Sequence, residues 1–228
     1  MTENKIFKEN LTSKLLQKQA LRVLMKLNKK NVCEIGCGDG NISNFLLSNL
    51  KKTHYFHISD ISKSAIIQAK KKIDYNNIIF KVGNLFSPWK EKKFDLVISD
   101  VSSLSQPVAD KSPWYKGVKS DCGVDGLKNV NKLMKQINKY LKPDGILVIP
   151  LISLSNTIEL KKKLKKKFKY LKESKRTYWP IPKFFKQNIR LFDKLLEKKI
   201  IYYEEKFGIY LAYTSIAICK KLKDNSVR

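Results

Sequence analysis

The side chains best placed to do chemistry follow short apolar segments of the chain. The segment VCEIGCGDG (residues 32–40) joins a short apolar run to glycines at alternate positions, and a segment with helical periodicity follows at 42–50. This order predicts a strand, a tight turn and the start of a helix. Glycine in such a turn permits positive φ, and the backbone N–H groups of the turn then face a ligand.

The G-x-G-x-G spacing alone leaves two interpretations open. It is neither the G-x-G-x-x-G of nicotinamide and flavin binders nor a P-loop. A turn that needs glycine only for its shape is the simpler interpretation. The second interpretation is a ligand site, and it depends on which residues follow the other strands.

Polar residues end the next predicted strands, where open α/β sheets bind ligands. Asp60 lies about 20 residues beyond the glycine turn, where an acid accepts hydrogen bonds from ribose hydroxyls. Asn84 follows the third strand and can hydrogen-bond an adenine edge, and Asp100 follows the fourth. The first four strands are predicted at 32–35, 55–59, 78–82 and 94–99.

Together these segments resemble the class I S-adenosylmethionine-dependent methyltransferases. The matching segments are E-x-G-x-G-x-G at 34–40, DIS at 60–62, GNLF at 83–86 and FDLV at 94–97, and the resemblance covers residues 30–155. It implies that the cofactor is S-adenosylmethionine, with the glycine turn at its methionine part, an acid at its ribose and Asn84 at its adenine. The implied cofactor-binding residues are Glu34, Gly36, Gly38, Gly40, Asp60, Ile61, Asn84 and Leu85.

The chemistry is expected after the fourth strand. Methyl transfer needs a nucleophile aligned with the methyl group and the sulfur, and a base where the nucleophile carries a proton. Asp100 is the candidate catalytic residue for alignment or deprotonation, although a strand-end acid can also orient a substrate ammonium or simply cap backbone N–H groups. The long loop 101–124 is expected to bind substrate through Ser102, Trp114 and Tyr115, whose rings can stack on a planar group or close over the site.

The segment 123–127 and the helix and turn that follow it are similar to the HemK/PrmC branch, which methylates glutamine amides in release factors. That branch carries Asn-Pro-Pro-Tyr after the fourth strand, whereas residues 100–103 read DVSS. The residues that grip and cover a planar amide are missing, which argues against glutamine or adenine N-methylation. The sequence is also slightly similar to ribose 2′-O methyltransferases, but residues 150–153 lack their lysine.

Strands and helical segments alternate along the chain, which predicts an α/β, three-layer, Rossmann-like methyltransferase fold. We expect a mostly parallel sheet with an antiparallel C-terminal edge, and one domain over 1–228. Within it, the expected parts are a helical N-terminal extension at 1–30, a cofactor-binding core at 30–155 and a C-terminal part at 156–228. The C-terminal part is predicted to hold an added helix at 183–199 and edge strands at 200–204 and 210–219.

Composition narrows the expected partners. The net charge of +27 would attract nucleic acid. Lysine dominates over arginine, however, so a solvated surface that reflects compositional bias is an equal alternative. The four cysteines and two histidines lack metal-ligand spacing, so no metal site is expected and the cysteines are predicted to be buried thiols. No apolar run is long enough to span a membrane and no signal peptide is evident, which favours the cytoplasm.

The methyl acceptor is left open by the sequence. A protein or an RNA fits the charge, and a small metabolite with an amine, hydroxyl or thioether fits the altered segment at 100–103. A third hypothesis is a catalytically silent methyltransferase-fold protein that binds RNA or a partner protein.

Overall fold

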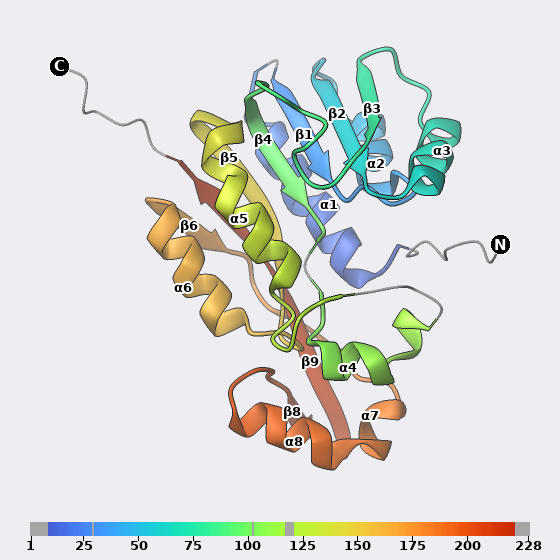
Figure 1. Ribbon diagram of the computed structural model, residues 1–228, viewed down its shortest axis with the longest axis vertical. Coiled ribbons are helices and arrows are strands. Elements are labelled where there is room, and N and C mark those ends of the chain that lie inside the picture. The colour runs from blue at the N-terminus through green and yellow to red at the C-terminus, as the bar shows by residue number, and fades with distance from the viewer. Residues whose placement is uncertain (1–8, 29, 102, 117–120, 222–228) are drawn as a thin grey trace.

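A computed structural model describes residues 9–28, 30–101, 103–116 and 121–221 of the 228-residue chain (Figure 1). Within these residues nine strands form one sheet in the order β3-β2-β1-β4-β5-β9-β6, and β7 and β8 also pair with β9. The first five strands run parallel. They are β1 (Asn31–Ile35), β2 (Tyr55–Asp60), β3 (Ile78–Val82), β4 (Phe94–Ser99) and β5 (Leu141–Ile152).

Helices cover both faces of the sheet, so the predicted three-layer fold is confirmed (Figure 1). On one face α5 buries Val130, Leu133 and Ile137, which recur at helical spacing. On the other face α1 buries Leu16 and Ala20 in a cluster with residues of β1, β4 and β5. The helices of these layers are α1 (Leu11–Leu24), α2 (Asn41–Asn49), α3 (Lys63–Lys72), α5 (Lys128–Tyr140) and α6 (Thr157–Lys167).

The antiparallel edge is also confirmed, but it is larger than the sequence indicated. The 12-residue strand β9 (Ile209–Lys220) runs antiparallel to β5, and three short strands pair with it. Of these, β6 (Tyr170–Glu173) and β7 (Thr177–Pro180) were not predicted, and β8 (Glu204–Lys206) replaces the strand expected at 200–204. Ile200 and Ile201 instead pack into a hydrophobic cluster, which removes them from the strand.

Two further expectations for the chain after the fourth strand were wrong in detail. The loop 101–124 contains α4 (Gln106–Lys111) and a short 3-10 helix, η1 (Pro113–Tyr115). The added helix is two helices, α7 (Phe184–Gln187) and α8 (Ile189–Glu197), because the backbone leaves the helical conformation at Asn188 (φ −121°). The side chain of Asn188 donates to the carbonyl of Phe184 at 2.8 Å, which ends the first helix.

These elements build a further hydrophobic cluster, beyond the carboxyl ends of β1 and β4 (Figure 1). We call α4, η1, α7, α8 and the adjoining ends of β7, β8 and β9 the α7–α8 lobe. Its centre is a stack of Phe185 on Phe192, with ring centroids 4.2 Å apart and both side chains fully buried. The lobe shares β9 with the main sheet. No helix among the described residues has both the length and the apolar character needed to cross a bilayer.

Candidate functional site

The carboxyl ends of the parallel strands meet at one edge of the sheet, and backbone hydrogen bonds fix them there. The N–H groups of Gly36 and Cys37 donate to the carbonyl of Ser59 at 2.9 and 3.1 Å. Gly83, just after β3, donates to the carbonyl of Asp60 at 2.9 Å. The glycine turn and the residues that end β2 and β3 therefore form one continuous edge, as the sequence predicted.

The turn after β1 needs glycine for two separate reasons. Gly36, Gly38 and Gly40 have φ of +75°, +54° and +82°, a region that side chains disfavour. A Cβ on Gly36 would also lie 2.9 Å from the Cγ1 of Val101, so the segment after β4 packs directly against the turn. The turn thus sets the spacing between β1 and the candidate catalytic segment.

Asp60 is held in place by two backbone donors. Its Oδ2 accepts from the N–H of Gly38 at 2.9 Å, and its Oδ1 accepts from the N–H of Ser62 at 2.8 Å. The hydroxyl of Ser62 caps α3 by accepting from the N–H of Ala65. Each carboxylate oxygen keeps further acceptor capacity, so a half-buried Asp60 can bind a hydroxyl-bearing ligand.

Glu34 is a buried carboxyl group with one oxygen occupied and one free. Its Oε2 accepts from both the N–H and the hydroxyl of Ser43. Its Oε1 is buried and finds no partner among the described residues, which is costly for a carboxyl group. The pKa of Glu34 is raised to about 8, mainly by burial. The hydrogen bonds from Ser43 lower this pKa, and the nearby charges of Asp100 and Asp60 add to its rise.

Asp100 lies at the end of β4, and the N-terminal helix covers it. The hydroxyl of Ser13 in α1 donates to its Oδ2 at 3.0 Å. Burial raises the pKa of Asp100 to about 7, although the Ser13 hydrogen bond lowers it. A second residue of α1, Gln17, reaches the carbonyl of Asn41 beside the glycine turn at 3.3 Å. No local pattern marks Ser13 as a site residue, because the contact joins residues 87 positions apart in the chain.

The remaining residues assigned to the cofactor differ in exposure. Ile61 follows Asp60 and is 71% exposed, and Asn84 is exposed after β3. Leu85, by contrast, lies in the main hydrophobic cluster with φ of +51°. The side chains of Ile61 and Asn84 are therefore accessible to a ligand, whereas the side chain of Leu85 packs in the hydrophobic core.

The residues assigned to the acceptor lie in the α7–α8 lobe or outside the described residues. Ser102 lies outside them. Trp114 is 41% exposed, and its ring contacts those of Trp179 and Phe184, with centroids 5.7 and 5.8 Å apart. The hydroxyl of Tyr115 accepts from the N–H of Leu104 at 3.3 Å, so this ring holds the segment after β4.

Hydrogen bonds connect Trp179, which contacts Trp114, to the N-terminal helix α1. The Nε1 of Trp179 donates to the Oγ1 of Thr214 at 3.1 Å, and this oxygen lies 3.4 Å from the Oγ1 of Thr12. Thr12 precedes the residue that binds Asp100. Trp179 was not predicted as a site residue, because β7 is a strand only through its pairing with β9, some 35 residues later in the chain.

Electrostatically this edge differs from the rest of a chain with a net charge of +27, because buried or half-buried acids gather there. No group of His, Cys, Asp and Glu side chains in the described part of the chain could hold a metal ion. All four cysteines are free and buried, as the sequence predicted.

Comparison with known proteins gives the family. A family model described as "Methyltransferase domain" matches residues 26–208. This chain belongs to that methyltransferase family. Its class I resemblance, read from the sequence, is thereby confirmed.

Two curated relatives fit the branch named above. The chain is 28% identical over 145 residues to a release factor glutamine methyltransferase of Fusobacterium nucleatum, covering 59% of this chain and 40% of that protein. It is 30% identical over 148 residues to a putative protein N5-glutamine methyltransferase of Methanocaldococcus jannaschii, covering 64% and 73%. The chain therefore spans less than half the length of the first relative.

Solved structures agree on the fold. A ribosomal protein L11 methylase of Lactobacillus delbrueckii subsp. bulgaricus superposes with a TM-score of 0.55 at 13% identity, over 93% of this chain and 80% of that one. A 16S rRNA N2 G1207 methyltransferase of T. thermophilus, solved with AdoMet and guanosine, gives 0.58 at 12%, over 94% and 44%. At these identities the likeness establishes architecture alone.

Proposed function

We propose that this chain is an S-adenosylmethionine-dependent methyltransferase in which Asp100 positions or deprotonates the acceptor. The observation that carries the proposal is the meeting of Glu34, Asp60 and Asp100 at adjacent strand ends, where their charges influence one another. Such a concentration of acids in a strongly basic chain suits a cationic ligand. The family match supports the same activity.

The residues present fit this cofactor. S-adenosylmethionine carries a positive sulfonium and an ammonium group, and it supplies an electrophilic methyl group when bound. The buried, unpartnered Oε1 of Glu34 provides an acceptor for a cationic or N–H-bearing group. Asp60 would hold the ribose hydroxyls, and the exposed Asn84 and Ile61 would contact the adenine.

Asp100 is suited to move a proton near neutral pH. A general base works best when its pKa lies near the operating pH, and burial raises the pKa of Asp100 to about 7. The Ser13 hydrogen bond orients one carboxylate oxygen and leaves the other for the acceptor. At pH below 7 the carboxyl group becomes protonated and loses this capacity.

The acceptor is proposed to differ from the glutamine amide that the names of the two relatives indicate. Residues 100–103 lack the Asn-Pro-Pro-Tyr that grips and stacks on such an amide. The exposed ring of Trp114, supported by Trp179 and Phe184, offers a different planar surface. Under this proposal the methyl acceptor is a protein, an RNA or a small metabolite.

We also propose that the protein works in the cytoplasm. Its four cysteines are free and buried, and Cys33 and Cys37 flank the glycine turn without forming a disulfide. Thiols persist in reducing compartments.

Labelling tests this function directly. A cell lysate is incubated with a radioactive methyl donor and the protein, then treated with protease or nuclease and separated by size. We expect labelled acceptor with the native protein and at least a hundredfold slower labelling with Asp100→Asn, the scale of lost general-base catalysis. Asp74→Asn, an exposed acid after α3, is the matched control. Cofactor binding without any transfer would favour the silent binding protein instead.

A further inference from the structure

A pocket of about 470 Å³ lies beside the edge strand β3. This volume falls within the range of about 300–1,000 Å³ that small-molecule sites occupy. None of the residues assigned above to cofactor or acceptor lines it. Its walls include the side chains of Lys81, Ser87, Trp89, Lys90 and Lys92.

None of the helices in the described part of the chain covers this face of the sheet at β3 (Figure 1). Phe80 of β3 packs with the α3 cluster, so its neighbours Ile79 and Lys81 point to the opposite face. There the connection from β3 to β4 crosses the sheet and forms the second wall (Figure 1). Trp89 anchors this wall, since it is buried and its Nε1 donates to the hydroxyl of Ser59 at 3.1 Å.

Two of the lining lysines are held in position. The Nζ of Lys92 lies 2.6 Å from the Nε2 of the buried His57, whose pKa is lowered by burial and then by the charge of Lys92. A neutral imidazole accepts this hydrogen bond. The Nζ of Lys81 donates to the carbonyl of Pro88 at 3.1 Å and lies 5.1 Å from the ring of Trp89. Each ammonium group has three donors, so each keeps two for a ligand.

The positive charges in this pocket are not neutralised by acids. Within the described part of the chain, Lys81, Lys90 and Lys92 take part in none of the ion pairs, and no carboxylate lines the pocket. Elsewhere two lysines share a single acid, as Lys30 and Lys142 do with Asp95. The pocket therefore combines fixed, uncompensated ammonium groups with the hydroxyl of a serine.

We propose that this pocket binds a phosphate group, either in the backbone of single-stranded RNA or in a small phosphate ester. Lysine ammonium groups bind phosphate as point charges, and positions fixed before binding lower the entropy lost on binding. The net charge of +27 would draw polyanions toward the molecule from a distance. Binding here does not depend on methyl transfer, so it can be tested apart from the proposed activity.

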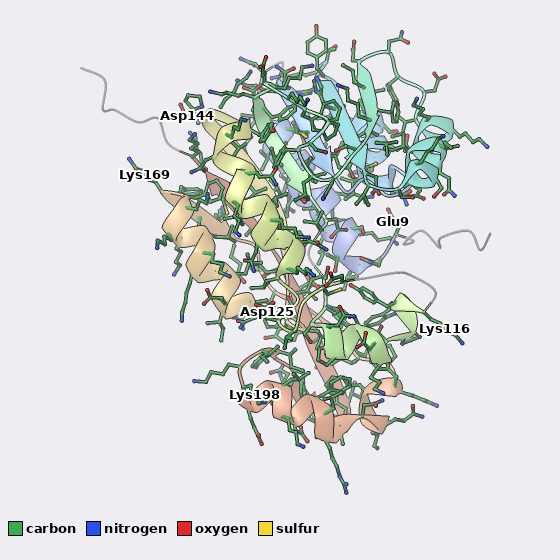
Figure 2. The ribbon with its side chains drawn as sticks, viewed as in Figure 1. Glu9, Lys116, Asp125, Asp144, Lys169 and Lys198 are labelled. Atoms are coloured by element: carbon green, nitrogen blue, oxygen red, sulfur yellow. The ribbon has the colours of Figure 1, made fainter. Side chains whose placement is uncertain are left out.

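Paired double variants provide the test. Lys81→Gln with Lys92→Gln removes the two held charges, and Lys162→Gln with Lys166→Gln removes two exposed charges from α6. The α6 helix lies beside β6, at the opposite end of the sheet from β3, and Figure 2 shows Lys169 beyond its end. Binding of a fluorescent single-stranded oligouridylate is measured by anisotropy over a salt series, and binding of AMP and inorganic phosphate by calorimetry.

We expect the pocket variant to bind at least one of these probes tenfold or more weakly, and the α6 variant to change less than twofold. For RNA, the slope of log affinity against log salt should fall by about 1 for each lost phosphate contact. Loss of AMP or phosphate binding assigns the site to a small phosphate ester, and loss of RNA binding alone assigns it to RNA. Equal weakening in both variants, or no binding of any probe by the native protein, overturns the proposal. Unchanged binding of S-adenosylmethionine in the pocket variant shows that it is folded.

Discussion

The strand-end edge and the α7–α8 lobe are built in different ways, although β9 connects the sheet to the lobe. At the edge, acids are held by hydrogen bonds: Glu34 by Ser43, Asp60 by Gly38 and Ser62, and Asp100 by Ser13 of α1. Backbone geometry and hydrogen bonds dominate there. These hydrogen bonds hold the acids in defined positions, as binding of a small ligand requires.

The lobe is held mainly by apolar and aromatic packing between distant segments. Phe185 stacks on Phe192 and meets Tyr203 edge-on, with centroids 4.7 Å apart. Thr177 on β7 pairs with Thr214 on β9. The edge is therefore ordered by hydrogen bonds to acids, whereas the lobe supplies a hydrophobic framework against which the ring of Trp114 packs.

The largest expected effect separates the stability of the lobe from cofactor binding. Phe192→Ala removes a fully buried ring and should lower the free energy of unfolding by about 3–5 kcal/mol in urea denaturation. Affinity for S-adenosylmethionine, measured where the variant is still folded, should change less than twofold. Lys194→Ala, an exposed change on the same helix, should stay within about 0.5 kcal/mol of the native protein. If Phe192→Ala weakens cofactor binding tenfold, the stability of the lobe and cofactor binding at the edge are not independent.

A pair of glycines sharpens the comparison. Gly36 at the edge and Gly208 in the β8–β9 turn have nearly equal φ, +75° and +72°. Alanine should therefore cost about 1–2 kcal/mol at either position. Only at Gly36 does a Cβ meet a neighbour, Val101, at 2.9 Å, whereas at Gly208 nothing lies within 4 Å.

We therefore expect Gly36→Ala to lose about 1–3 kcal/mol more stability than Gly208→Ala. It should also weaken cofactor binding at least tenfold, because the turn and the segment after β4 are forced apart. Gly208→Ala should leave the affinity unchanged. Denaturation curves and calorimetry on both variants test this, and equal losses of affinity would show that the close approach at Gly36 does not matter.

The two regions also differ in how far the sequence predicts them. The first four parallel strands were predicted to within a residue, and Asp60, Asn84 and Asp100 were placed after the second, third and fourth of them. This succeeded because apolar runs, glycine turns and the polar residues after them are local signals. Buried runs such as Phe94–Ser99 leave few alternatives to a central strand.

In the C-terminal part, the helical segment at 183–199 and the strand at 210–219 were predicted, but the short strands were not, because their signals are not local. The strands β6 and β7 become strands only because β9, some 40 residues later, offers an edge to pair with. Ser13 and Trp179 reach the site by tertiary packing, and no pattern in the chain marks either of them. The role of every site residue remains a prediction, since ligand contacts have to be measured.

A smaller expected effect is the pH dependence of folding stability, which arises mainly from acids at the strand-end edge. Burial raises the pKa of Glu34 to about 8 and that of Asp100 to about 7, above their unfolded values of about 4. The folded state therefore binds more protons than the unfolded state, so stability falls as pH rises through this range. The pKa values of His54 and His57 are lowered by burial and act in the opposite direction, but only below about pH 6.5.

Between pH 6.5 and 8 we expect the ligand-free protein to lose on the order of 1–2 kcal/mol of stability. Glu34→Gln removes one of the titrating groups and keeps an acceptor for Ser43, so it should flatten this dependence. Urea denaturation at several pH values measures it. A native protein whose stability rises over this interval would show that Glu34 is ionised at neutral pH.

The central claim is that the strand-end edge binds S-adenosylmethionine, and calorimetry of that compound tests it most directly. The native protein should bind it, and Asp60→Ala and Gly38→Val should each weaken binding at least tenfold, because Asp60 holds both the turn and the ribose. Asp74→Ala, with the same loss of charge on the surface, should bind normally. Unchanged affinity in both edge variants, or a native protein that does not bind the compound, would contradict the account.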